Sequence, residues 1–144
     1  MNGAVECPPT IEELIGSSKP VTGLDERYVV KHFLGKSQSE ARRMYPEGGY
    51  HITEDFTYMA SAGLRYYLIP ALEYLRSEES AGDYDFCHGL MCSLYCQVTS
   101  SHPPTEVSSL MKEIAAFADA HRDKFGLAPQ EELFDKYVQT IRAA

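Results

Sequence analysis

Basic residues are scarce in this 144-residue sequence. Its 13 lysines and arginines stand against 21 aspartates and glutamates, which gives a formal net charge of −8. Nucleic acids and anionic bilayers attract proteins through positive charge, so this balance disfavours both as partners. We expect no nucleic acid and no membrane among the partners, and we expect neutral or basic proteins instead.

The sequence also lacks a long apolar run. Its longest apolar stretches, residues 64–75 and 86–98, are interrupted by charged residues, proline or histidine, and they fall short of the roughly 20 residues that cross a bilayer. Residues 1–9 lack the basic and apolar segments of a secretory signal peptide. We therefore expect a cytoplasmic protein whose four cysteines are reduced.

Familiar enzyme motifs are missing as well. The sequence contains no Gly-x-Ser-x-Gly elbow, no His-Glu-x-x-His pair and no Gly-x-Gly-x-x-Gly fingerprint. Residues 35–37 resemble the end of a phosphate-binding loop, but the glycine that this loop requires at position 30 is Val30. The sequence assigns no catalytic residue and no cofactor, and it favours a protein that is not an enzyme.

The remaining features describe an ordered helical protein. Hydrophobic residues make up 44% and charged residues 24%, close to the globular average, and the length suits one domain. Apolar residues recur with helical spacing through most of the chain. We predict a flexible N-terminal tail over residues 1–9. Residues 10–144 are predicted to form a compact, single-domain, all-α bundle of six or seven helices.

Helix starts and interruptions follow from local patterns. Residues 10–13 and 37–40 each spell a capping box, which marks a helix start. A helix over residues 83–98 has little polar face, so we predict that it is the buried central helix. Pro46 is predicted to stop one helix near its position. Pro70 is predicted to kink another helix, or to divide it into two.

His88, Cys92 and Cys96 stand four residues apart on this central helix. Imidazole and thiolate groups are good zinc ligands, and the spacing places all three toward one side. One helix rarely supplies so many ligands, however, and free cysteine is among the most buried residue types. We therefore predict a buried helix without a metal ion.

Arg65 lies in an otherwise apolar run, which predicts that its guanidinium is buried against a carboxylate. The leading interpretation is a structural ion pair with a carboxylate such as Asp55. The functional alternative is a pocket in which Asp55, Arg65, Tyr66 and Tyr67 receive an anionic ligand.

Five acidic residues lie between positions 73 and 85, and Arg76 is the only lysine or arginine in that segment. They are Glu73, Glu78, Glu79, Asp83 and Asp85. A solvated loop with helix-start aspartates is the simpler interpretation. The functional interpretation is an edge that docks a basic protein, because complementary charge accelerates encounter.

Three segments between residues 29 and 74 form a recognisable order: residues 33–36, residues 52–55, and above all the Leu-Arg-Tyr-Tyr-Leu segment at 64–68 followed by Pro-Ala at 70–71. In this order of features the chain resembles a family of small bacterial proteins of uncharacterised function. The family places the proline directly after the leucine, whereas Ile69 intervenes here. The resemblance implies a helical fold and a bacterial cytosolic setting, and it assigns no activity.

Three functions remain open from the sequence. The leading hypothesis is a small acidic binding protein that engages another protein, and its sharpest form is an immunity protein that neutralises a toxin or nuclease. The second is an enzyme or small-anion-binding protein with a pocket around Arg65. The third is a structural homo-oligomer, such as a homodimer, that uses the last helix as its contact face.

Overall fold

Seven α-helices make up most of the chain in the computed structural model, which describes residues 7–16 and 23–144. They are α1 (Ile11–Ile15), α2 (Leu24–Phe33), α3 (Gln38–Thr53), α4 (Ser61–Arg76), α5 (Tyr84–Val98), α6 (Ser108–Ala120) and α7 (Glu132–Ala143). Four short 3-10 helices join them: η1 (Glu54–Tyr58), η2 (Glu78–Ser80), η3 (Thr105–Val107) and η4 (Arg122–Phe125). The described ranges contain no strand, which confirms the all-α prediction. The predicted tail lies largely outside these ranges.

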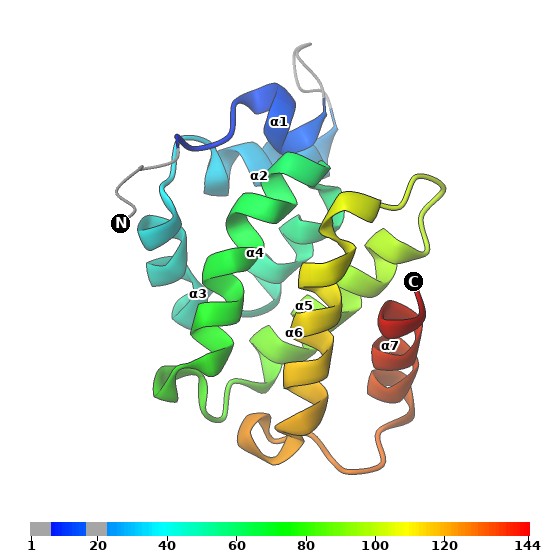
Figure 1. The fold of residues 1–144 in the computed structure, drawn as a ribbon. Coiled ribbons are helices and arrows are strands. Elements are labelled where there is room, and N and C mark those ends of the chain that lie inside the picture. The colour runs from blue at the N-terminus through cyan, green and yellow to red at the C-terminus, as the bar shows by residue number, and fades with distance from the viewer. Residues whose placement is uncertain (1–6, 17–22) are drawn as a thin grey trace.

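The helices pack around α5. Figure 1 shows α4 and α6 side by side on the near face, with α5 behind them and α7 beside α6. Helix α5 contacts α3, η1, α6 and α7, and its Phe86, Leu90 and Leu94 are fully buried. The prediction of a buried central helix is therefore confirmed. Within the described ranges, no helix has both the length and the apolar character needed to span a bilayer.

The predicted helix starts are confirmed by their hydrogen bonds. At α1 the backbone N–H of Glu13 donates to Thr10 Oγ1 at 3.2 Å, and the N–H of Thr10 donates to the Glu13 carboxylate at 2.9 Å. Ser37 and Glu40 form the same reciprocal pair at α3, at 3.1 and 2.9 Å. Each pair satisfies N–H groups that have no partner inside the helix.

Pro46 does not end its helix, so that prediction is wrong. Helix α3 continues to Thr53, and its backbone departs from helical geometry at Gly49, where φ is 52° and ψ is −138°. Proline removes one backbone donor, which a helix can tolerate locally, whereas a positive φ strongly favours glycine. The break at Gly49 sets the direction of residues 50–53, which lead into η1.

Pro70 lies inside α4, which runs as one helix from Ser61 to Arg76, so the alternative of two shorter helices is wrong. Proline has no N–H to donate to the carbonyl of Tyr66, four residues earlier. The side-chain amide of Gln38 donates to that carbonyl instead, at 2.8 Å. A side chain from α3 thus satisfies the carbonyl that Pro70 leaves unpaired, and the helix continues.

Candidate functional site

A hollow of about 420 Å³ opens between α2, the end of α3 and η1. It is lined by Leu24, Asp25, Tyr28, His32, His51, Glu54, Asp55 and Tyr58, and we call it the acidic hollow. Three of these residues are carboxylates, two are tyrosines and two are histidines, and no lysine or arginine is among them. The lining therefore presents negative charge and aromatic ring faces together.

Asp55 is the buried carboxylate of the acidic hollow, with 4% of its surface exposed. Its Oδ2 lies 2.5 Å from Nδ1 of His32, a distance that requires a proton between the two atoms. Burial raises the pKa of Asp55 to about 6, even though the hydrogen bond from His32 acts in the opposite direction. The pair can thus take up or release a proton close to neutral pH.

Side chains from α5 fix η1, and with it the position of Asp55. The amide nitrogen of Gln97 lies within hydrogen-bonding distance of the carbonyls of Phe56, Thr57 and Met59, at 2.8, 2.9 and 3.0 Å. Ser93 Oγ donates to the carbonyl of Thr53 at 2.6 Å. Because buried backbone carbonyls need donors and a short 3-10 helix leaves its last carbonyls without strong ones, these bonds hold the segment against α5.

The end of α2 is fixed from α4. Tyr67 is fully buried, and its hydroxyl lies 2.7 Å from the carbonyl of Phe33 and 2.8 Å from that of Lys36. The Phe33 carbonyl ends α2, where it also accepts from the N–H of Lys36 at 3.0 Å, and the Lys36 carbonyl lies in the turn that follows. Tyr67 therefore holds in place the helix that carries His32.

A second hollow of about 420 Å³ lies against α5. We call it the apolar hollow, because most of the surface that lines it belongs to apolar atoms. Its lining residues are Tyr50, Thr53, Glu54, Thr57, Tyr58, His88, Gly89, Cys92, Ser93 and Cys96. Two residues, Glu54 and Tyr58, line both hollows. The two hollows therefore adjoin at these shared residues, and they differ in charge: three carboxylates line the acidic hollow, whereas Glu54 is the one carboxylate among the described residues that line the apolar hollow.

The three residues that were weighed as zinc ligands all face the apolar hollow. His88, Cys92 and Cys96 line it together, as their spacing on one side of the helix indicated. The His88 ring stacks on Tyr84, and its Nε2 lies 3.5 Å from the carboxylate of Glu131. In the part of the chain that is described, no three His, Cys, Asp or Glu side chains are placed to share a metal ion.

The structure does not bring Asp55, Arg65, Tyr66 and Tyr67 into one pocket. Arg65 is exposed and lines a smaller hollow of about 220 Å³ together with Tyr66, whereas Tyr67 is in the core. The prediction that Arg65 is buried in an ion pair with Asp55 is therefore wrong, since His32 takes that place. The reason is geometric: Arg65 lies one turn from the exposed Ile69, on the solvent side of α4.

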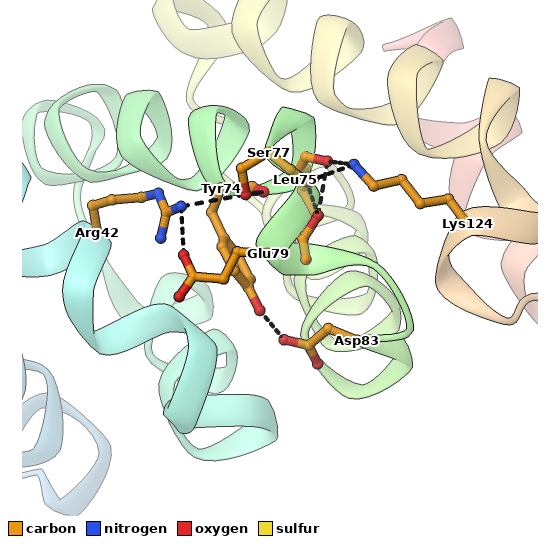
Figure 2. A network of polar contacts seen from close by, with 8 residues as sticks. Arg42, Tyr74, Leu75, Ser77, Glu79, Asp83 and Lys124 are labelled. Atoms are coloured by element: carbon orange, nitrogen blue, oxygen red, sulfur yellow. Dashed lines mark hydrogen bonds and ion pairs between the residues drawn. The ribbon is translucent and has the colours of Figure 1, made fainter.

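Some residues of the predicted acidic edge are bound to neighbouring side chains, and Figure 2 shows these contacts. Glu73, Glu78 and Asp85 are exposed. Asp83 accepts a hydrogen bond from the Tyr74 hydroxyl and caps α5 through the N–H of Phe86 at 3.1 Å. Asp83 is therefore part of the folded framework.

Two basic residues reach this edge from other elements. Arg42 of α3 donates to the Glu79 carboxylate at 2.8 Å and lies over the Tyr74 ring (Figure 2). Lys124 donates to the carbonyls of Leu75 and Ser77 at the end of α4, at 2.5 and 2.8 Å. These contacts balance part of the negative charge, and docking of a basic protein to the other carboxylates stays a prediction.

Comparison of the chain with protein-family models, with characterised proteins and with solved structures found no match. The resemblance of residues 29–74 to a bacterial family therefore stays a prediction. The candidate site rests on the geometry of the two hollows.

Replacing Asp55 tests its raised pKa. Since the folded protein holds the Asp55 proton more tightly than the unfolded chain, ionisation of Asp55 should lower the free energy of unfolding as the pH rises from about 4 to about 6. Asp55→Asn cannot ionise. We expect the parent to lose stability relative to this variant between pH 4 and pH 7, measured by urea unfolding at each pH. A stability difference that stays constant across the range would contradict the prediction.

Proposed function

We propose that the protein binds a small organic cation in the acidic hollow. The observation that carries the proposal is the lining itself, which combines Asp25, Glu54 and Asp55 with the rings of Tyr28 and Tyr58. Carboxylates neutralise a cation, and aromatic ring faces attract it through their quadrupoles. The volume is within the range of small-molecule sites.

The charges around the hollow favour this ligand class. Asp25 and Glu54 are exposed at its rim, and Asp55 is buried. The net charge of −8 adds a long-range attraction for cations. Burial, and then the nearby carboxylates of Asp25 and Glu54, raise the pKa of Tyr58, so its hydroxyl stays neutral and donates hydrogen bonds.

The same lining supports binding more than nucleophilic catalysis or metal binding. No serine or cysteine is among the described residues that line the acidic hollow, so the His32–Asp55 pair has no side chain of these two nucleophile types beside it there. Among the described residues, no three His, Cys, Asp or Glu side chains are close enough together to hold one metal ion. An ammonium group, with several N–H donors, fits carboxylates that are spread around a hollow.

The source of the ammonium group is a free amine or a lysine side chain of a basic protein. The second source agrees with the sequence-based hypothesis of a basic protein partner. Both sources present the same head group to the same carboxylates. They differ in the chemical group attached to the ammonium, so separate titrations with an alkylamine and with a lysine peptide distinguish them.

Calorimetric titration with n-butylammonium chloride tests the proposal. We expect saturable binding that weakens about three- to tenfold in Asp25→Asn and in Glu54→Gln, because each removes one charge near the ligand. Binding should also weaken as the pH falls below about 6, since Asp55 is then protonated. The matched control is Glu73→Gln, which removes an exposed carboxylate that lines neither hollow.

Two further titrations make the result decisive. 1-Butanol has a similar shape without the charge, and we expect it to bind far more weakly. An equal concentration of sodium chloride measures the effect of ionic strength. Binding of n-butylammonium that is absent, or that is equal in the parent and in the double variant Asp25→Asn/Glu54→Gln, would overturn the proposal.

A further inference from the structure

We infer that the ligand is an amine with an apolar tail, which places its ammonium group in the acidic hollow and its tail in the apolar hollow. This inference rests on the proposed function and extends it from a charge to a ligand class. Its basis is that Glu54 and Tyr58 line both hollows. A molecule bound beside Asp25 and Asp55 can therefore extend past Tyr58 and reach α5.

The apolar hollow is suited to a hydrocarbon or aromatic tail. Its α5 wall is formed by Gly89, Ser93 and the two thiols of Cys92 and Cys96, with His88 at one end. Burial raises the pKa of Cys96, so this thiol is uncharged at neutral pH and does not repel an apolar group. The hydroxyl of Ser93 donates to the carbonyl of Thr53, so this donor needs no acceptor on the ligand.

Exposed apolar surface is concentrated at the two hollows. Tyr28 and Leu24 are 46% and 64% exposed at the acidic hollow, and Tyr50 is 45% exposed at the apolar hollow. These are three of the six large hydrophobic side chains that are exposed in the described ranges. A ligand with an apolar tail would cover part of this surface, which gives such a ligand an advantage over a small polar cation.

The test is a series of n-alkylammonium chlorides from methyl to hexyl, titrated calorimetrically into the full chain. Once the tail reaches past Tyr58, we expect the affinity to rise about two- to fourfold for each added methylene. Cys96→Tyr fills the apolar hollow from an exposed position of α5. In this variant we expect the gain with chain length to disappear while the affinity for methylammonium stays unchanged.

Thiol modification gives a second measurement that needs no variant. Hexylammonium should slow the reaction of Cys92 and Cys96 with iodoacetamide, and methylammonium should not. Cys7 is exposed and lines neither hollow, so its reaction rate is the internal control.

The outcomes separate the two proposals. If methylammonium binds and the affinity does not rise with chain length, the inference is overturned and the cation site stands. The same holds if the affinity rises equally in Cys96→Tyr and the thiols are not protected. If no amine binds, both proposals fail. The last outcome concerns Nα-acetyl-lysine amide, which keeps its side-chain ammonium group. If it binds as tightly as hexylammonium, the inference is also overturned, because a lysine side chain would then be the better occupant.

Discussion

Gln97→Met should lower the free energy of unfolding by about 2–4 kcal/mol, although methionine has nearly the same volume. The Gln97 side chain is 8% exposed, and its amide is the donor near the carbonyls of Phe56, Thr57 and Met59. A buried carbonyl that loses its donor costs about 1–3 kcal/mol, and methionine donates nothing. We expect a drop in Tm of about 6–12 °C for a chain of this size.

Gln139→Met is the matched control for this change. Gln139 is exposed on α7, so the same substitution there should alter the free energy of unfolding by less than about 0.5 kcal/mol. Gln97→Met should also weaken the binding of n-butylammonium, because η1 carries Asp55. Equal stability of the two variants would show that Gln97 does not hold η1 in place.

Gly89→Ala should destabilise the fold by about 1–3 kcal/mol, even though alanine favours helices over glycine by about 1 kcal/mol. A Cβ at position 89 would lie 2.3 Å from Thr53 Oγ1 and 2.8 Å from Cδ1 of Tyr50. Thr53 is buried, and its hydroxyl donates to the carbonyl of Gly49 at 3.3 Å, so it cannot move aside freely. Steric overlap therefore exceeds the gain in helix propensity.

A double-mutant cycle with Thr53→Ala identifies the cause. Removing the Thr53 hydroxyl removes the nearest of these atoms, and the half-exposed Tyr50 ring, which is the next nearest, can rotate. In urea unfolding, we expect Gly89→Ala to lower the free energy of unfolding by about 1 kcal/mol less in the Thr53→Ala background than in the parent. Additive effects would show that the cost of Gly89→Ala does not come from contact with Thr53.

Sequence reasoning fails at the candidate site because its contacts join distant segments. Sequence patterns assign His32 no role and pair Asp55 with Arg65, whereas the structure pairs His32 with Asp55 across 23 residues. One local signal is present: Gly89, Ser93 and Gln97 repeat every four residues on an otherwise apolar helix. Such a stripe of small and polar residues indicates a close backbone neighbour, which here is the end of α3 together with η1.

The features that sequence patterns predict correctly depend either on residues close together in the chain or on the composition of a whole segment. Capping boxes place the starts of α1 and α3, because their bonds join residues three apart. The apolar composition of residues 83–98 indicates a buried helix, and the charge balance comes from counting residues.

The direction in which each side chain faces relative to other elements depends on how the helices pack. Arg65 and Tyr67 are two residues apart on one helix, yet one is in solvent and the other is in the core. Pro70 is tolerated because Gln38 of another helix reaches the carbonyl of Tyr66. The two hollows likewise exist only where α2, η1 and α5 meet, because helical periodicity fixes the angle between neighbouring side chains but not which face meets a neighbouring helix.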